Sequence, residues 1–379
     1  MRILFTGGGT GGHFYPIIAV AAAVNEIAEA EKLFGIEMYF LSSDPYDKRL
    51  LFENNIIYKQ IAAGKIRRDF SPKSMLKNFL DILKTVAGTL NALWKLYVIY
   101  PDVVFGKGGY TSFPTLFAAR VLRLPVVIHE SDSHPGRVNL WASKFARRVA
   151  VSYPEVAGYF PKDKVALTGN PLRKEILSPI THGALEFLEL EKDVPTIFVT
   201  GGSQGALNLN DILLDVTSEL VEKYQIIHQT GKNNFSEVER RAAFLLNGNP
   251  LAKRYKPFTY LNETALRMIG GVVDLAISRA GSTIFELAAW GVPSIVVPLP
   301  EEVSHDQRTN AFAYARSGAA IVIEEKNLSG TILLHEIERL MSSPETMDGM
   351  KKKALNFSPK DAAVKIAKEL IAIGLEHEQ

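Results

Sequence analysis

The segment ILFTGGGTGG at residues 3–12 has a close counterpart, IFVTGGSQGA, at residues 197–206. In both segments a short apolar run bounded by glycines predicts a buried β-strand that leads through a tight turn into a helix. The matching positions are Ile3, Thr6, Gly7 and Gly8 in the first copy and Ile197, Thr200, Gly201 and Gly202 in the second. Two strand–glycine–helix units half a chain apart favour two doubly wound α/β domains in tandem.

Further apolar runs alternate with helical stretches along the chain, a pattern typical of mostly parallel sheets. We expect strands at residues 37–43, 103–105, 126–129, 149–152, 224–229, 275–278, 294–298 and 320–324. The turn-forming sequence Gly169-Asn170-Pro171 marks the domain boundary. We therefore expect one Rossmann-like domain at residues 1–170, completed by a C-terminal helix at 359–379, and a second at 171–358. A ligand in this architecture binds in the interdomain cleft, at the carboxyl ends of the strands.

The composition excludes several classes of protein. Lys plus Arg is 43 and Asp plus Glu is 41 among 379 residues, so the net charge of +2 gives no reason to expect a nucleic-acid partner. The absence of cysteine excludes disulfide scaffolds and thiol chemistry. The uncharged stretch at residues 3–25 is interrupted by five glycines, unlike a signal peptide or membrane span. We expect a cytosolic chain without a spanning segment.

The first glycine loop contains the pattern G-x-G-x-x-G and permits three interpretations. It could bind a dinucleotide, with Asp44 after the next strand as the ribose ligand. Its glycines could merely tighten a strand–helix turn. We favour a third interpretation, in which both glycine loops let backbone N–H groups and helix starts approach an anionic ligand, because it accounts for two equivalent loops.

A third glycine-containing turn, SRAGSTIFE, occupies residues 278–286, where a predicted strand gives way to a helix. Glu286 lies three residues after Thr283, a spacing typical of a capping box. The same carboxylate could instead accept hydrogen bonds from both hydroxyls of a ribose, and the spacing alone does not decide between these alternatives.

Taken in order, these motifs resemble the family 28 glycosyltransferases of peptidoglycan synthesis. Those enzymes move N-acetylglucosamine from UDP-GlcNAc to undecaprenyl-pyrophosphoryl-MurNAc-pentapeptide (lipid I), giving lipid II. The resemblance covers most of the chain. Its motifs are GGGTGGHFYP (7–16), GKGGYTSFP (106–114), PVVIHES (125–131), PGRVN (135–139), GNPLR (169–173), GGSQGA (201–206), HQTGK (228–232), residues 279–286, and Asp306-Gln307 with Asn310-Ala311.

The resemblance implies an inverting GT-B enzyme whose C-terminal domain binds the donor and whose N-terminal domain binds the acceptor. The implied UDP-GlcNAc-binding residues are Thr10, Gly11, Gly12, Arg173, Gly202, Ser203, Gln204, Tyr260, Leu261, Gly281, Ser282, Thr283, Glu286, Asp306 and Gln307. The implied acceptor-binding residues are Lys107, Gly108, Gly109, Tyr110, Asp132 and Asn139. In this assignment Glu286 holds the ribose. Lys107 replaces an apolar or small residue of the family and is expected to meet the acceptor pyrophosphate.

An inverting transfer needs positive potential at the leaving diphosphate and a base for the acceptor hydroxyl. The chain has no Asp-x-Asp motif, so helix N-termini and Arg173 are the expected substitute for a metal, and no cofactor is expected to be obligatory. His13 is the first candidate base, because a helix N-terminus disfavours its protonated form. Glu130 and Asp132 are the alternatives.

Residues 73–98 have helical periodicity, with Lys73, Lys77, Lys84 and Lys95 on one side. Met75, Phe79, Leu83, Val86, Leu90, Leu93, Trp94 and Tyr97 occupy the opposite side. That side could pack on the sheet. Alternatively, it could rest on the cytoplasmic face of the bacterial plasma membrane, with Lys65, Arg67 and Arg68 near anionic lipid.

Two further functions remain open. One is a glycolipid transferase with the same donor but another acceptor, and the other is a catalytically silent nucleotide-sugar-binding relative.

Overall fold

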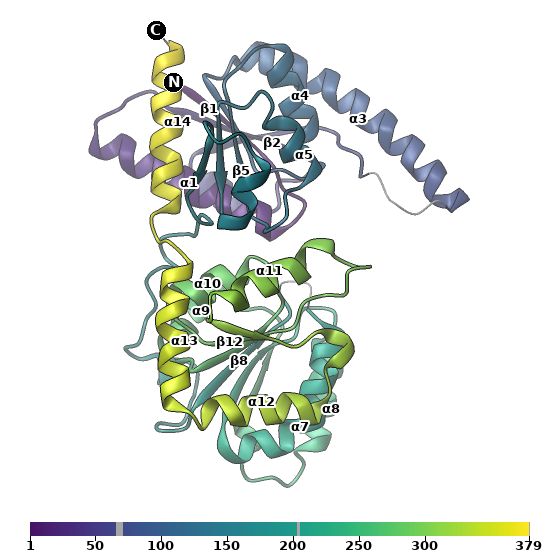
Figure 1. Cartoon of the computed structure of the whole chain (residues 1–379), viewed down its shortest axis with the longest axis vertical. Coiled ribbons are helices and arrows are strands. Elements are labelled where there is room, and N and C mark those ends of the chain that lie inside the picture. Colours follow the sequence, from purple (N-terminus) through teal and green to yellow (C-terminus); the bar gives the residue numbers. More distant parts are fainter. Residues whose placement is uncertain (66–70, 203–204, 379) are drawn as a thin grey trace. The chain divides into compact units, whose positions relative to one another are not determined.

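The computed structural model describes residues 1–65, 71–202 and 205–378, which form two compact units (Figure 1). Unit 1 contains Met1–Arg173 and Lys360–Gln379, and unit 2 contains Lys174–Pro359. The division between the units lies after Arg173, whereas the sequence led us to expect it after Asn170. The Arg173 guanidinium lies 4.7 Å from the centroid of the Tyr15 ring in unit 1. Pro359 likewise groups with unit 2 and not with the C-terminal helix.

Unit 1 is built on a seven-stranded parallel sheet with the order β3-β2-β1-β4-β5-β6-β7. Its strands are β1 (Arg2–Thr6), β2 (Glu37–Ser42), β3 (Ile56–Gln60), β4 (Val103–Gly106), β5 (Val126–Glu130), β6 (Arg148–Val151) and β7 (Val165–Leu167). Thr6 is in register with Gly106 of the neighbouring strand β4. The glycine loops that follow β1 and β4 therefore leave the sheet side by side.

The helices of unit 1 cover both faces of this sheet. They are α1 (Gly11–Ala30), α2 (Lys48–Glu53), α3 (Pro72–Ile99), α4 (Phe113–Val121), α5 (Arg137–Ala142), η1 (Pro154–Tyr159) and α14 (Ala362–Glu378). Because side chains alternate along a strand, Ile3 and Phe5 of β1 share one face, where they join a core with residues of α1 and α14. Figure 1 shows α14 running along this unit, and its Ile366 and Leu370 belong to the same core.

Unit 2 repeats the plan with a six-stranded parallel sheet of order β10-β9-β8-β11-β12-β13. Its strands are β8 (Thr196–Thr200), β9 (Gln225–Gln229), β10 (Tyr255–Phe258), β11 (Leu275–Ser278), β12 (Ser294–Val296) and β13 (Ala320–Val322). Its helices are α6 (Ala184–Phe187), α7 (Leu207–Lys223), α8 (Phe235–Leu245), η2 (Ala252–Arg254), α9 (Glu263–Val272), α10 (Thr283–Trp290), α11 (His305–Arg316), η3 (Glu325–Asn327), α12 (Gly330–Met341) and α13 (Pro344–Phe357). Ile197 and Val199 pack against α7 and α12, whereas Phe198 packs on the opposite face against α9 and α10.

The two doubly wound parallel sheets expected from the sequence are confirmed, and the strands that the sequence missed lie at edges. These are β3 and β7 of unit 1 and β10 of unit 2.

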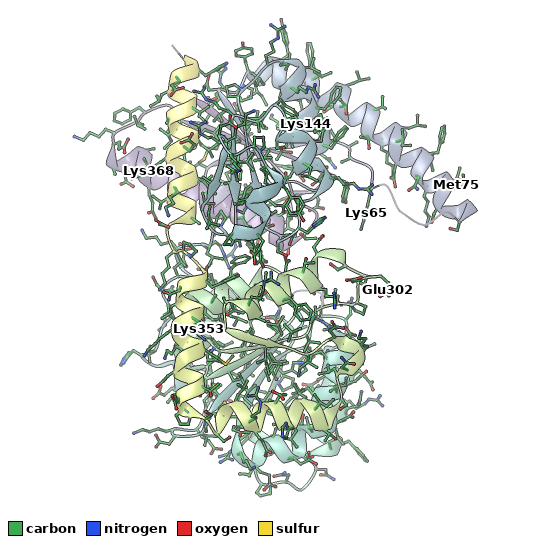
Figure 2. The ribbon with its side chains drawn as sticks, viewed as in Figure 1. Lys65, Met75, Lys144, Glu302, Lys353 and Lys368 are labelled. Carbon is green, nitrogen blue, oxygen red and sulfur yellow. The ribbon has the colours of Figure 1, made fainter. Side chains whose placement is uncertain are left out.

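Helix α3 exposes the apolar side that the sequence analysis considered as a possible packing surface. Only a narrow stripe is buried, which includes Ala92 and Leu96. By contrast, Phe79 is 59% exposed and Trp94 is 67% exposed. Figure 2 shows Met75 near the beginning of this helix, away from the sheet of unit 1. The interpretation that this apolar side packs on the sheet is therefore wrong. In the described part of the chain, no helix combines the length and apolar character that crossing a bilayer requires.

A buried polar network ties α7, β9 and β10 together in unit 2. The Nε2 atom of His228 lies 3.0 Å from Asn210 Oδ1, and its Nδ1 atom lies 2.7 Å from the Tyr255 hydroxyl. Asn210 Nδ2 donates to the carbonyl of Thr230, so its Oδ1 faces the histidine and accepts from Nε2–H. The Tyr255 hydroxyl then donates to Nδ1, which requires a neutral ring. Burial accordingly lowers the pKa of His228 to about 3.

This network makes unit 2 sensitive to acid. The unfolded chain binds a proton at a histidine near pH 6.5, whereas folded His228 does so only near pH 3, so stability is lost as the pH falls through this window. We expect His228→Gln to flatten the slope of unfolding free energy against pH by as much as about 1.4 kcal/mol per pH unit. Denaturant titrations between about pH 6 and 4 measure this slope.

Replacing Trp94 and Trp141 with Phe leaves Trp290 as the single tryptophan reporter, and it belongs to unit 2. Equal slopes for this protein with and without His228→Gln would contradict the assignment.

Candidate functional site

The carboxyl edge of the unit 1 sheet brings His13 against the loop that follows β4. His13 lies in the first turn of α1, and its Nδ1 atom is 3.2 Å from the carbonyl oxygen of Gly8. Because a carbonyl only accepts, Nδ1 carries the proton and the lone pair is on Nε2. Gly109 has a φ of +76°, and a Cβ atom there would lie 3.1 Å from His13 Cε1. The positive φ therefore favours glycine at this position, and a side chain there would press against the imidazole.

The remaining residues expected around this loop are accessible to different degrees. Thr10 is exposed at the N-cap of α1 and makes no side-chain cap hydrogen bond, while Gly11 and Gly12 are half-buried in the first turn. Tyr110 is 38% exposed just after the β4 loop. The start of α1 thus presents helix N–H groups without a side-chain cap, beside a partly exposed phenol.

Lys107 does not present its charge to a ligand, contrary to the sequence expectation. The residue is 1% exposed, and its Nζ atom lies 2.7 Å from Nδ1 of His129. The Nε2 atom of His129 lies 3.1 Å from the Gly169 carbonyl, so Nε2 carries the ring proton and Lys107 donates to Nδ1. Lys107 is thus a donor to a buried histidine at the end of β5.

Glu130 is also buried, and its carboxylate holds the loop that follows β5. It is 4% exposed and accepts hydrogen bonds from the backbone N–H groups of Asp132 (3.0 Å) and Gly136 (2.9 Å). A third bond comes from Nδ2 of Asn139 at 2.9 Å, and the same Nδ2 donates to the His129 carbonyl. Asn139 is 2% exposed and packs against Gly108, so both residues support the loop from within.

The charged groups at this edge shift one another's pKa values. Burial and the nearby Lys107 ammonium lower the pKa of His13, against the opposing effects of Asp132 and the Gly8 carbonyl. Burial lowers the pKa of Lys107 to about 8, opposed by Glu130 and Asp132. Burial and the neighbouring Asp132 raise the pKa of Glu130 to about 7, although three hydrogen bonds favour its carboxylate. Near pH 7, His13 is therefore neutral beside a mostly protonated lysine.

In unit 2 the glycine turn after β8 leads into the start of α7. Gly205 has a φ of +77°, and a Cβ atom there would lie 2.3 Å from the Thr230 carbonyl, so only glycine fits. Gly202 donates its N–H to the Thr200 hydroxyl at 3.0 Å. Ala206 is the N-cap of α7, and no side-chain cap is present among the described residues. Ser203 and Gln204, which the sequence analysis placed at the diphosphate, lie outside the described residues.

The second helix start in unit 2 belongs to α10. Gly281, Ser282 and Thr283 are half-buried, and Ser282 is the N-cap without a side-chain cap hydrogen bond. Glu286 is the fourth residue of the helix and therefore does not occupy the third position that a capping box requires. The capping-box interpretation is wrong, and Glu286 remains a half-buried carboxylate one turn beyond an uncapped helix start. By contrast, Asn262 caps the neighbouring helix α9 by accepting from Ala265 N–H.

Buried Arg279 links the α10 start to other elements of unit 2. Its Nη1 atom donates to the carbonyls of Val297 (3.0 Å) and Pro298 (3.3 Å) and to Glu325 Oε2 at 2.6 Å. The other Glu325 oxygen accepts from Nδ2 of Asn208 in the first turn of α7, at 2.9 Å. Glu325 therefore connects the two glycine-led helix starts, by an ion pair with Arg279 before α10 and a hydrogen bond from Asn208 of α7.

The other donor-site candidates occupy neighbouring loops of the same unit. Tyr260 is 57% exposed after β10, and the adjacent Leu261 is buried. Asp306 and Gln307 lie in the first turn of α11, where Gln307 Oε1 accepts from Leu299 N–H at 3.2 Å. Asn310 Nδ2 donates to the Ala280 carbonyl at 3.4 Å, which joins α11 to the turn before α10.

Three important side chains were missed by the sequence analysis: His129, Glu325 and Asn208. His129 could have been found from its position at the end of a predicted strand, beside Glu130. Glu325 and Asn208 carry no local signal, because they meet Arg279 only through the tertiary fold. In the ranges that the structure describes, no group of three His, Asp or Glu side chains is arranged to hold a metal ion.

Comparison with known proteins identifies the family. Residues 3–151 match the glycosyltransferase family 28 N-terminal domain, and residues 196–369 match its C-terminal domain. The UDP-N-acetylglucosamine–N-acetylmuramyl-(pentapeptide) pyrophosphoryl-undecaprenol N-acetylglucosamine transferase of Halalkalibacterium halodurans is 32% identical, over 97% of this chain and 98% of its own. The transferase of the same name from Oenococcus oeni is 33% identical over 100% and 99%.

Among solved structures, the chain is similar to Acinetobacter baumannii MurG, with a TM-score of 0.72 and 26% identity over 98% of this chain and 99% of that one. The GT-B fold expected from the sequence is thereby confirmed, and the dinucleotide-binding interpretation is set aside. The chain belongs to the UDP-N-acetylglucosamine–N-acetylmuramyl-(pentapeptide) pyrophosphoryl-undecaprenol N-acetylglucosamine transferases of glycosyltransferase family 28.

Proposed function

We propose that this chain transfers N-acetylglucosamine from UDP-GlcNAc to the 4-hydroxyl of the MurNAc residue of lipid I, with inversion at C1, to form lipid II. The observation that carries this proposal, beside the family, is the pair of glycine-led helix starts in unit 2 that have no side-chain cap among the described residues. Such starts stabilise anions, because their N–H groups and dipoles point toward the ligand. A nucleoside diphosphate matches that chemistry.

In this proposal the donor binds at the carboxyl edge of the unit 2 sheet. The diphosphate binds at the glycine turn before α7, to which Gly202 belongs, and at the start of α10, Gly281–Thr283. Ser203 and Gln204, outside the described residues, are assigned to the diphosphate from the sequence, and Glu286 accepts both ribose hydroxyls. The exposed ring of Tyr260 and the backbone of Leu261 frame the uracil, and Asp306 and Gln307 contact the sugar. Arg173, Thr10, Gly11 and Gly12 add positive potential for the leaving group.

His13 is the proposed base. The acceptor oxygen forms a bond to C1 of the sugar, the bond from C1 to the diphosphate oxygen breaks, and the hydroxyl proton goes to Nε2 of His13. The Gly8 carbonyl supports this role, because it fixes the proton on Nδ1 and leaves the Nε2 lone pair available. The lowered pKa of His13 keeps the ring neutral at pH 7, as a base requires.

Glu130 has a different proposed role. Its two oxygens already accept three hydrogen bonds from the loop that follows β5. We therefore assign Glu130 and Asn139 to holding this loop, and Asp132, Gly108, Gly109 and Tyr110 to the acceptor.

We further propose that no metal ion is obligatory. The sequence has no Asp-x-Asp motif. Two helix starts without a side-chain cap among the described residues, each worth roughly half a unit charge, together with Arg173 oppose the charge of the leaving diphosphate.

Helix α3 is the proposed contact with the membrane, on the cytoplasmic face of the bacterial plasma membrane. Its exposed apolar residues would rest in the interface, and Lys77 and Lys84, both exposed on the same helix, would meet anionic headgroups. Lys65 is exposed as well, while Arg67, Arg68 and the side chain of Lys73 lie outside the described residues. This attachment would bring the enzyme to an acceptor with a polyprenyl tail.

The transfer itself is tested by a donor–acceptor panel scored for UDP release. We expect release with UDP-GlcNAc and lipid I, at a rate unchanged by EDTA, and at least about tenfold slower release with UDP-glucose, which lacks the N-acetyl group. Release only with a different polyprenyl-linked sugar would support the alternative glycolipid transferase. No release with any acceptor, despite UDP-GlcNAc binding, would support the silent relative.

The base is tested by His13→Gln. We expect kcat to fall by about 10²- to 10⁴-fold, because the hydroxyl proton loses its acceptor, while the Kd for UDP-GlcNAc changes by less than about threefold. Exposed His182, replaced in the same way, is the matched control and keeps full activity. Near-normal turnover of His13→Gln would reject this assignment.

Membrane attachment is tested by co-sedimentation with phosphatidylglycerol-containing vesicles. We expect binding to fall on raising salt from about 0.05 to about 0.5 M, since the lysine contribution is screened, and to fall on Phe79→Ser. Phe244→Ser is the control, because Phe244 is 81% exposed in unit 2 and lies outside the proposed surface. Binding that responds to neither salt nor Phe79→Ser would remove the proposal.

A further inference from the structure

Lys107 is a buried charge that the proposed reaction does not use. Its ammonium group donates to Nδ1 of His129 at 2.7 Å, and its side chain is only 1% exposed. The backbone N–H of Lys107 donates to the Thr6 carbonyl at 2.9 Å, at the end of β1. A Cβ atom placed on Gly7 would lie 2.9 Å from the Lys107 Cβ, so the residue lies directly against the first glycine loop.

The hydrogen bonds around His129 explain why this charge is tolerated. Nε2–H of His129 donates to the Gly169 carbonyl, and the Ser152 hydroxyl lies 3.3 Å from the same nitrogen. The ring is therefore held in one tautomer, with its Nδ1 lone pair directed at the ammonium of Lys107. Lys107 thus donates to a buried side chain, and the nearby Glu130 and Asp132 favour its charged form, so its effect on the reacting groups is electrostatic and does not require contact with substrate.

We propose that Lys107 is a positioning residue: its ammonium group, held in place by the Nδ1 lone pair of His129, is the buried positive charge that favours the neutral form of His13. This inference rests on the proposed function, because it concerns the proton state of the residue assigned as the base. It also explains why this chain can carry a lysine where the resemblance leads us to expect an apolar or small residue.

Two charged groups act on His13: Lys107, which follows β4, and Asp132, in the loop that follows β5. His129 and Glu130 are the last two residues of β5. Burial and then Lys107 lower the pKa of His13, whereas Asp132 raises it. Burial and Lys107 also hold the pKa of His129 well below its usual value, so His129 adds no charge. Because the pKa of Lys107 is about 8, the lysine is still charged at neutral pH.

The sign of the effect follows from these charges. Without the ammonium group, protonation of His13 becomes easier and its pKa rises. A base must be unprotonated, so the acid limb of kcat/KM then moves to higher pH. Loss of the Asp132 carboxylate instead lowers the pKa of His13, which moves the acid limb of kcat/KM to lower pH.

The experiment is an NMR titration of the histidine ring nitrogens in the full chain, paired with the pH profile of kcat/KM. His13→Gln identifies the His13 resonances. We expect Lys107→Met to raise the pKa of His13 by about one unit and to move the acid limb equally, and Asp132→Asn to lower that pKa. Lys32→Met is the control and should shift neither value, because exposed Lys32 follows the far end of α1, and that end at Ala30 is about 26 Å along the helix from His13.

Methionine is close in shape to lysine and removes a buried charge, so we expect Lys107→Met to fold. Thermal unfolding and the Kd for UDP-GlcNAc check this directly. An unchanged His13 pKa in folded Lys107→Met overturns the inference, whether or not the chain transfers N-acetylglucosamine. A raised His13 pKa with an unmoved acid limb supports the role of Lys107 and overturns the assignment of His13 as base.

Discussion

Both units depend on the same constraint, which is that every strand of a parallel sheet ends at one edge. The register of Thr6 with Gly106, and of Thr200 with Ser278, brings the glycine turns after neighbouring strands together at that edge. The following helices begin there, and α1, α7 and α10 begin without a side-chain cap among the described residues. Partial positive charge is thus concentrated at each edge before any charged side chain is considered.

The sequence predicted the central strands because each contains a short, mostly apolar run. All residues of β4, β5, β8 and β11 are buried, and each was expected from its pattern. The missed strands β3, β7 and β10 have only one neighbour in the sheet and keep exposed or half-exposed positions. These edge strands form because a neighbouring strand pairs with them, and the local sequence pattern does not identify that neighbour.

In the candidate site too, features set by local sequence were predictable and features set by tertiary contacts were not. Glycines such as Gly109 and Gly205 were predictable, because a local turn requires them. The burial of Lys107 against His129, the three hydrogen bonds to Glu130 and the contact of Arg279 with Glu325 were not, since each joins separate strands or loops. Residue type indicated which side chains could do chemistry. Only tertiary contacts determine which of these side chains point inward. They show that Lys107, expected to contact the substrate, donates a hydrogen bond inside unit 1.

The packing of α14 has a consequence for how the chain is made. Ala363, Ile366, Ala367 and Leu370 of this helix fill the same core as Ile17 and Val20 of α1, yet all of unit 2 lies between them in the sequence. During translation, the ribosome makes all of unit 2 before it makes α14, which completes the core of unit 1. Unit 1 therefore reaches its final packing only after unit 2 has had time to fold. Premature termination near the end of the message would remove α14 and damage the core of unit 1.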